Sequence, residues 1–279
     1  MDVLITTEAL AARIAAGQRT VILDVRWALG STTGEEDHLA GHIPGAVYVD
    51  LETELAAPAR PQAGRHPLPE PAAFAAATSR WGIDPVDTVV VYDAVGGLSA
   101  ARAWWLLRDA GLAEVFLLDG GWAAWPAAGG EVATGPVTPL PGRWVPHPGS
   151  LPVLDADGAA AFPSTGVLLD ARAGERFRGE TEPVDPRPGH IPGALNAPTA
   201  AHLDADSRFL SAEALREKFA ALGPAAGGPP VAVYCGSGVT AAHEIAALAI
   251  AGIDAALYPG SYSQFSSDPA REVATGPTG

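Results

Sequence analysis

The sequence is poor in the residues that cross-link small proteins or hold metal ions. Cys235 is its only cysteine, so no intramolecular disulfide can form, and a reducing compartment such as the cytoplasm is expected. A single thiol also excludes thiolate metal cages, and the seven histidines fall in no HExxH or CxxC/HxxxH pattern. We therefore predict no metal site and no cofactor.

Basic residues and long apolar runs are also scarce. The chain has 17 Lys and Arg against 32 Asp and Glu, a formal net charge of −15, whereas nucleic-acid binding rewards clustered basic side chains. No stretch approaches the roughly 20 consecutive apolar residues of a membrane-spanning helix. The first residues lack the basic start and apolar run of a secretory signal. We expect a soluble protein that binds neither nucleic acid nor membranes.

The sequence does contain a repeat with a period of about half its length. Residues 21–26 read VILDVR and residues 167–172 read VLLDAR. The hexapeptide GHIPGA follows each of them, at 41–46 and again at 189–194. Identical hexapeptides at matched positions indicate a duplication, and 279 residues are enough for two domains of ordinary size.

Each half alternates short apolar segments with helical ones. The segments TVVVYD (88–93) and PVAVYC (230–235) are each followed by a glycine-containing loop and then a helix. This alternation predicts an α/β fold with a mainly parallel sheet flanked by helices. Helical segments end at a glycine, the expected stop signal, in four places: Gly17, Gly111, Gly223 and Gly252.

A stretch rich in proline and glycine separates the two halves. Residues 126–152 contain seven Pro and five Gly without a sustained periodicity, which is typical of a linker. We predict an N-terminal domain over 1–128, a linker over 129–150 and a C-terminal domain over 151–279.

Cys235 stands at the end of a predicted buried strand and shortly before a helix. The loop between them consists of Gly236, Ser237, Gly238, Val239 and Thr240. Ligands of open α/β sheets bind at the carboxyl ends of strands, and two glycines let this loop turn several backbone N–H groups toward the sulfur. These donors and the helix dipole would stabilise a thiolate or a persulfide anion. We predict that Cys235 is a catalytic nucleophile.

The alternative is a buried cysteine that acts as a small hydrophobic residue, which needs neither the loop nor the helix start. The residue equivalent to Cys235 in the first half is Asp93, which cannot carry sulfur. One half is therefore predicted to be active and the other to be scaffold.

These motifs resemble one family over residues 3 to 268, the tandem-domain rhodanese and 3-mercaptopyruvate sulfurtransferases. The resemblance rests on DVR and DAR, both GHIPGA segments, DGGWAAW (119–125), RFRGETEP (176–183) and above all CGSGVT (235–240). It implies two rhodanese-like domains, a persulfide intermediate on Cys235 and a site between the halves. The acceptor would be a thiol, cyanide or a thioredoxin-like protein.

Two other functions on such a chain are weighed against this one. In a phosphatase of the same fold, five residues separate the loop cysteine from an Arg that grips the phosphoryl oxygens, but this position is Ala241. A phosphatase is therefore disfavoured. A non-catalytic sulfur-relay or binding module remains open.

Four arginines precede the second GHIPGA, and arginine suits carboxylate recognition. The resemblance implies that Arg176 and Arg187 bind the anionic sulfur donor, whereas for Arg172 and Arg178 we predict a structural ion pair or a solvated face. Family members specialised for thiosulfate carry cationic side chains in the cysteine loop. This loop instead has Gly236 and Ser237, which favours 3-mercaptopyruvate and leaves thiosulfate as the alternative donor.

Three further residues support the mercaptopyruvate branch by resemblance. Ser237 lies two residues after the nucleophile, and His66 lies in RHPLP (65–69), similar to the family's H-x-L-P segment. Glu52 stands where the branch carries a carboxylate that orients this histidine. The roles implied are Ser237 as hydrogen donor to the substrate, His66 as its proton partner and Glu52 as orienter.

Overall fold

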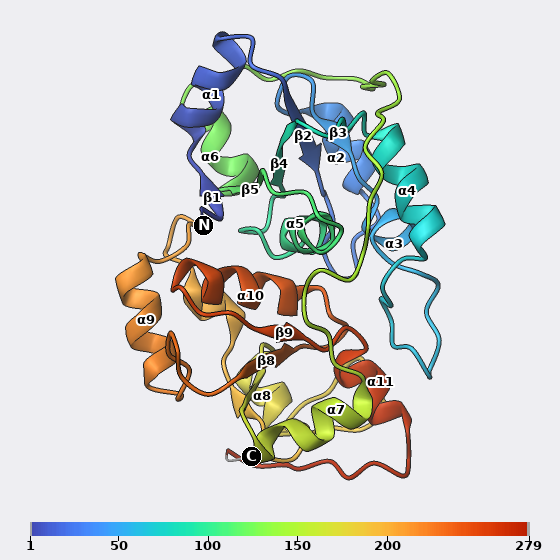
Figure 1. Ribbon diagram of the computed structural model, residues 1–279, viewed down its shortest axis with the longest axis vertical. Coiled ribbons are helices and arrows are strands. Elements are labelled where there is room, and N and C mark those ends of the chain that lie inside the picture. Colours follow the sequence, from blue (N-terminus) through green and yellow to red (C-terminus); the bar gives the residue numbers. More distant parts are fainter. Residues whose placement is uncertain (1, 278–279) are drawn as a thin grey trace.

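The computed structural model describes residues 2–277 and has two α/β domains stacked along its long axis (Figure 1). The N-terminal sheet is parallel, with strand order β1-β5-β4-β2-β3. Its strands are β1 (Leu4–Ile5), β2 (Thr20–Asp24), β3 (Val47–Tyr48), β4 (Thr88–Tyr92) and β5 (Val115–Leu118).

Helices cover both faces of this sheet. Along the central strand β4, Val89 and Val91 pack on the face of α4 and α5, whereas Val90 and Tyr92 pack on the opposite face. A strand buried on both sides explains the unbroken apolar run in the sequence. The helices are α1 (Thr7–Ala15), α2 (Gly34–Ala40), α3 (Leu51–Glu54), α4 (Pro71–Arg80), α5 (Ala100–Asp109) and α6 (Gly121–Ala127).

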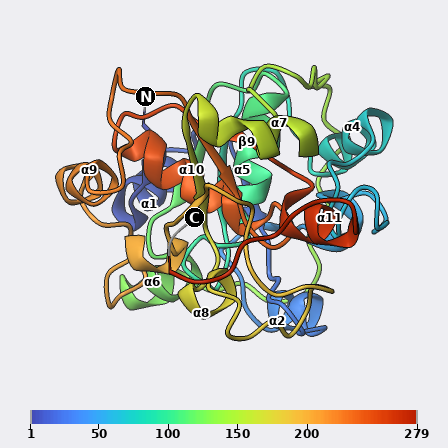
Figure 2. The same ribbon diagram turned by 90° about the horizontal axis from the view of Figure 1, so that it is seen from below.

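The C-terminal domain repeats this plan with four parallel strands in the order β7-β6-β8-β9. The strands are β6 (Val167–Asp170), β7 (Leu195–Asn196), β8 (Val231–Tyr234) and β9 (Ala256–Leu257). The helices are α7 (Ala156–Ala161), α8 (Gly174–Phe177), α9 (Ala212–Ala220), α10 (Thr240–Ile250) and α11 (Ser261–Ser267), with short 3₁₀ helices at Phe162–Ser164 and Thr199–His202. Figure 2 shows α9 and α11 on opposite sides of this domain. The predicted fold class is confirmed.

Helix ends follow the glycine signals of the sequence. Each of the four glycines expected to end a helix lies just beyond one and has a positive φ, from +63° at Gly17 to +109° at Gly223. A residue with a side chain is strained in this left-handed conformation, so glycine is the natural stop.

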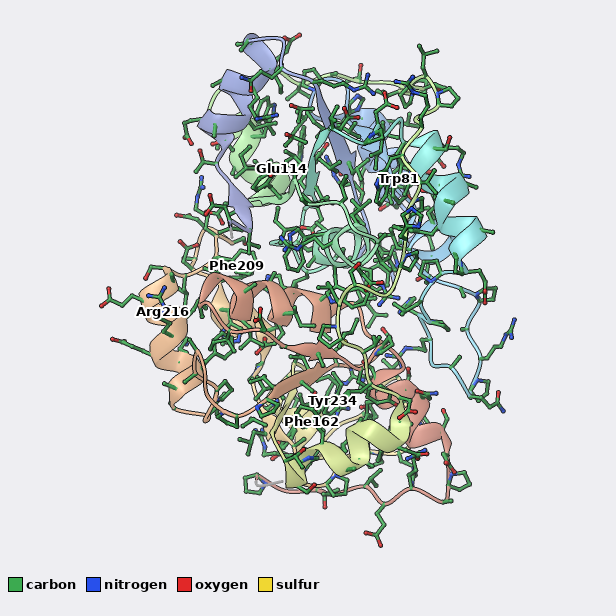
Figure 3. All side chains as sticks on the ribbon, in the orientation of Figure 1. Trp81, Glu114, Phe162, Phe209, Arg216 and Tyr234 are labelled. Carbon is green, nitrogen blue, oxygen red and sulfur yellow. The ribbon has the colours of Figure 1, made fainter. Side chains whose placement is uncertain are left out.

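The two domains meet where α5 packs against α10 (Figure 1). One hydrophobic core runs from the N-terminal sheet through both helices into the C-terminal sheet. Polar contacts also cross the boundary: the backbone N–H of Phe209, labelled in Figure 3, donates to Asp119 Oδ1 at 3.0 Å, and Nε2 of His243 lies 3.2 Å from the Gly96 carbonyl oxygen. The domains are therefore one packed unit, with a continuous interface on which a site can be built.

The segment predicted as a linker contains no helix or strand and runs along the N-terminal domain. The backbone N–H groups of Gly142 and Trp144 donate to Ser79 and Ile83 carbonyls, at 2.8 and 3.0 Å. Within the described residues, no helix combines the length and the apolar character needed to cross a membrane.

Candidate active site

The cysteine loop joins β8 to α10 at the domain interface. Cys235 is 1% exposed, and its sulfur accepts a hydrogen bond from the backbone N–H of Gly238 at 3.1 Å. Gly238 has φ +81°, and a Cβ at this position would overlap the carbonyl oxygen of Pro259. The close turn that aims this donor at the sulfur therefore requires glycine.

The matching loop of the first half shows what such a turn binds. The carboxylate of Asp93 accepts hydrogen bonds of 2.7 to 2.8 Å from four backbone N–H groups, those of Val95, Gly97, Ser99 and Ala100. Burial raises the pKa of Asp93, and these four donors oppose that shift. The first loop is thus filled by its own anionic side chain, whereas the second holds a sulfur atom that can receive a further group.

A cavity of about 280 Å³ opens directly over the cysteine loop. The loop contributes Cys235, Gly236, Ser237, Val239 and Thr240, whereas Gly238 lies behind them with its N–H on the sulfur. The N-terminal domain contributes Trp27, Leu29, Arg65 and Leu98, and the C-terminal domain adds Ala171, Arg172, Ala173, Arg176, Pro198, Thr199 and Ala200. The cavity is shared by the two domains.

Ser237, His66 and Glu52 form a hydrogen-bonded chain beside this cavity. Ser237 Oγ lies 2.7 Å from Nδ1 of His66, and Nε2 of His66 lies 3.2 Å from Oε1 of Glu52. Since a carboxylate only accepts, the neutral imidazole donates from Nε2 to Glu52 and accepts the Ser237 proton at Nδ1. Trp27 Nε1 donates to the same Glu52 oxygen at 2.8 Å. The Glu52 side chain is therefore long enough to reach the imidazole of His66.

Burial controls the charge of His66, which is 4% exposed. Burial lowers the pKa of His66 below its usual 6.5, and Arg102 and Arg65 act in the same direction, while the Glu52 carboxylate opposes them. His66 is therefore neutral at physiological pH and can accept a proton from Ser237.

Arg176 points its guanidinium into the cavity and is held by two buried carboxylates. Its Nη2 donates to Glu182 at 2.6 Å and to Asp185 at 3.0 Å, and its Nε donates to Glu182 at 3.2 Å. Arg65, from the other domain, forms an ion pair with the same Asp185. Nothing in the RHPLP segment itself marks Arg65 as a site residue, because its approach to Arg176 depends on domain packing.

Arg187 does not line the cavity. Its three guanidinium nitrogens donate to four backbone carbonyls at 2.7 to 3.3 Å, those of Phe265, Ser266, Asp268 and Arg271. This corrects the expectation that Arg187 binds the donor: its donors are consumed in holding the end of α11. Arg172 and Arg178 form ion pairs with Asp170 and Glu180, the first of the two roles expected for them.

Arg102 is a functional candidate that the sequence analysis missed. It is completely buried on α5 and donates to the Gly238 carbonyl at 3.1 Å and to the His66 carbonyl at 3.0 Å. Burial lowers the pKa of Arg102 to about 10, while the charge of Cys235 opposes that shift. One guanidinium thus ties the cysteine loop to the histidine segment and places a positive charge near the sulfur. No sequence motif separates it from ordinary helix arginines.

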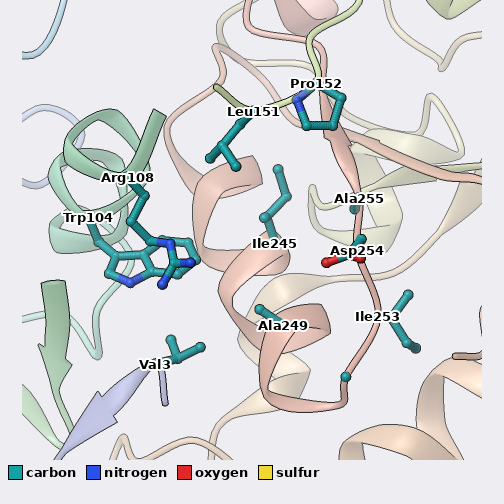
Figure 4. Close-up of a pocket in the computed structure, with 11 residues that line it drawn as sticks. Val3, Trp104, Arg108, Leu151, Pro152, Ile245, Ala249, Ile253, Asp254 and Ala255 are labelled. Atoms are coloured by element: carbon teal, nitrogen blue, oxygen red, sulfur yellow. The ribbon is translucent and has the colours of Figure 1, made fainter. Parts of the chain in front are cut away.

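A second, larger cavity of about 480 Å³ lies toward the other end of α10 (Figure 4). Trp104 and Arg108 of α5 face Ile245 and Ala249 of α10 across it. It contains no nucleophile and none of the predicted site residues, so the smaller cavity over Cys235 is the candidate active site.

Comparison with known proteins identifies the family. The rhodanese-like domain matches residues 6–128 and again residues 155–268. The chain therefore belongs to the rhodanese family, with two copies of the domain.

Relatives with full-length similarity carry two kinds of name. A protein of Mycobacterium tuberculosis (strain H37Rv) named as a thiosulfate sulfurtransferase, SseB, is 48% identical over 99% of this chain and 98% of its own length. A protein of Pseudomonas aeruginosa named as a 3-mercaptopyruvate sulfurtransferase is 45% identical over 98% of each chain. The crystal structure of the 3-mercaptopyruvate sulfurtransferase SseA from Escherichia coli aligns with a TM-score of 0.82 at 32% identity, covering 94% of this chain and 99% of that one.

Proposed function

We propose that this chain is a sulfurtransferase that takes sulfur from 3-mercaptopyruvate, carries it as a persulfide on Cys235 and passes it to a thiophilic acceptor. The observation that carries this proposal is the hydrogen-bonded chain from Ser237 through His66 to Glu52 at the edge of the Cys235 cavity. A ketoacid donor must gain a proton during transfer, and these hydrogen-bonded side chains are placed to accept and return it.

The reaction would begin with attack of the Cys235 thiolate on the donor sulfur. The sulfur–carbon bond breaks, and its electron pair stays on the ketoacid as the enolate of pyruvate. The proton that the donor thiol gives up converts this enolate to pyruvate. His66 Nδ1 can hold that proton in the interval, with Ser237 relaying it to and from the donor.

The backbone of the loop would hold the persulfide product. Gly238 already donates to the Cys235 sulfur, and the amides of Thr240 and of the next residue open α10, where helix N–H groups lack intrahelical partners. The matched donors of the first half bind the Asp93 carboxylate, which supports anion binding at this turn. Arg176 would pair with the donor carboxylate.

Thiosulfate remains the second candidate donor, because a relative of 48% identity is named for it. Its leaving group, sulfite, needs no proton, so the two donors differ in their need for Ser237. For the acceptor we keep the three classes of the sequence analysis: a thiol, cyanide or a thioredoxin-like protein. The cytoplasm is the proposed compartment, in keeping with one unpaired cysteine.

The test is to compare Ser237→Ala and His66→Ala with the unmodified protein on both donors. We expect kcat with 3-mercaptopyruvate to fall by about 10²-fold or more in each variant, since a positioned proton donor contributes that much. The rate with thiosulfate should change by much less. An equal loss with both donors, or none, would contradict the assigned roles, and a protein inactive with every donor would favour the binding module.

A further inference from the structure

The arginines around the cavity differ in how many of their guanidinium nitrogens donate hydrogen bonds to the protein. Arg172 and Arg187 use all three guanidinium nitrogens on protein acceptors. Arg65 uses only Nη1, on Asp185, and its Nε is buried without a hydrogen-bond partner within residues 2–277. Arg176 uses Nε and Nη2. Two of these four arginines therefore keep donors that the described part of the chain does not occupy.

The remaining donors of these two arginines converge on one point of the cysteine loop. A Cβ on Gly236 would lie 2.8 Å from Nη2 of Arg65 and 3.6 Å from Nη1 of Arg176. These are the nitrogens that Asp185 and Glu182 leave unused. Both arginines line the cavity, and their side chains are 26% and 17% exposed. Two half-satisfied cations facing the residue after the nucleophile make an anion site.

Asp185 bridges Arg65 and Arg176 through its carboxylate. Its side chain is 1% exposed, and it accepts from Arg65 through one oxygen and from Arg176 through the other. Burial raises the pKa of Asp185, and the two guanidinium groups oppose that shift. Because Arg65 belongs to the N-terminal domain, this carboxylate connects the two halves of the site.

We infer that Arg65 is a second donor-binding arginine, contributed by the N-terminal domain, which together with Arg176 holds the anionic end of the sulfur donor over Gly236. This inference rests on the proposed function and adds a specificity-determining residue to it. Arg65 supplies from the other domain the positive charge that the cysteine loop itself lacks. Asp185 keeps its ion pairs with Arg65 and Arg176 when the donor is bound, and its negative charge offsets part of their positive charge.

Charge decides which donor depends more on Arg65. The attraction between two ions scales with the product of their charges, so the dianion thiosulfate gains more from one guanidinium than the monoanion 3-mercaptopyruvate does. Loss of Arg65 should therefore shift donor preference further toward 3-mercaptopyruvate.

The test compares Arg65→Gln with Arg60→Gln, a matched loss of one charge at an exposed position near the start of the same loop. Arg65→Gln should raise the KM for 3-mercaptopyruvate about tenfold and the KM for thiosulfate by a larger factor, with kcat changed less than KM. Arg60→Gln should leave both values within about twofold. An Arg65→Gln protein with the KM values of the Arg60 control would overturn the inference.

Asp185→Asn separates donor binding from a purely structural ion pair. If Arg65 binds the donor, removing the nearby negative charge should lower KM for both donors, the opposite direction to Arg65→Gln. If the pair serves only to join the domains, both variants break it, and KM should rise in both. That second result would overturn the inference.

Failure of the inference can be told from failure of the proposed function by intact mass after donor treatment. If the unmodified protein and the Arg60 control gain one sulfur atom, the sulfurtransferase function stands, whatever Arg65 does. Binding of 3-mercaptopyruvate to Cys235→Ser, measured by calorimetry with and without Arg65→Gln, tests the anion site without turnover. Equal affinities would again contradict a role for Arg65.

Discussion

At the residue scale, the charge of His66 determines whether Ser237 can pass on a proton. A neutral imidazole accepts at Nδ1, whereas an imidazolium has a proton on both nitrogens and cannot accept. Burial keeps the pKa of His66 below 6.5 although Glu52 pulls it upward. Activity with 3-mercaptopyruvate should therefore persist below pH 6.5 and fall only where His66 finally gains its proton.

Glu52→Gln tests this account through the pH profile. The variant lacks the negative charge that raises the pKa of His66, so the acidic limb of kcat/KM for 3-mercaptopyruvate should move to lower pH. The same measurement with thiosulfate is the control: sulfite departs without a proton, so Glu52→Gln should leave the acidic limb of the thiosulfate profile, set by the Cys235 thiolate, where it is. A limb for 3-mercaptopyruvate that moves to higher pH, or a shift of equal size with both donors, would contradict the role of His66.

At the element scale, the turn between β8 and α10 depends on a glycine without space for a side chain. Gly238→Ala should destabilise the protein by about 2 to 4 kcal/mol, because it adds a clash with the Pro259 carbonyl to the strain of a positive φ. Activity should fall with it, since the N–H of Gly238 is the donor to the sulfur. Urea unfolding and steady-state rates give both values.

Gly252→Ala is the matched control, because Gly252 has the same φ of +81° and no atom within 4 Å of an added Cβ. Gly252→Ala should lower the free energy of unfolding by about 1 kcal/mol, because it adds only the strain of a positive φ, and should leave activity unchanged. Equal destabilisation in the two variants would show that the close contact at the cysteine loop is unimportant.

The elements themselves were largely predictable from the sequence. Alternating apolar and helical segments, with glycine stops, predicted two parallel sheets because these signals are local. The site was predictable only in part. The Cys235 loop is one continuous segment, whereas Arg65 and Arg102 act through contacts between domains that no local pattern reports. The prediction for Arg187 was wrong because its position before GHIPGA defines its segment but not the direction in which its side chain points.

At the scale of the whole molecule, a buried histidine couples the domain interface to pH. His243 Nε2 donates to the Gly96 carbonyl of the N-terminal domain at 3.2 Å, and its Nδ1 accepts from the Thr199 hydroxyl at 2.7 Å. Burial lowers the pKa of His243 to about 3, and nearby His202 adds to the shift. Folding therefore requires a neutral imidazole at this position.

The sign of the pH effect follows from the unfolded chain, in which histidine titrates near 6.5. Between pH 6.5 and about 3 the unfolded state binds a proton that folded His243 does not, so stability is full above pH 6.5 and is lost as the pH falls. Acidification from about pH 7.5 to about pH 5.5 should lower the contribution of His243 to the free energy of unfolding by about 1 kcal/mol.

Urea unfolding of the unmodified protein and of His243→Gln at these two pH values isolates that cost. The glutamine does not titrate, so the variant should lose less stability on acidification, by about 1 kcal/mol. The other buried ionisable groups are present in both proteins and cancel in the difference. Identical losses would show that His243 does not contribute to acid sensitivity.

The most direct test of the sulfurtransferase account is the intact mass of the protein after treatment with 3-mercaptopyruvate. Cys235 is the only thiol in the chain, so the unmodified protein should gain the mass of one sulfur atom and lose it again when a thiol acceptor is added. Cys235→Ser should keep its fold, gain no mass and transfer no sulfur. An active serine variant, or turnover by an unmodified protein that never gains the sulfur, would contradict the persulfide on Cys235.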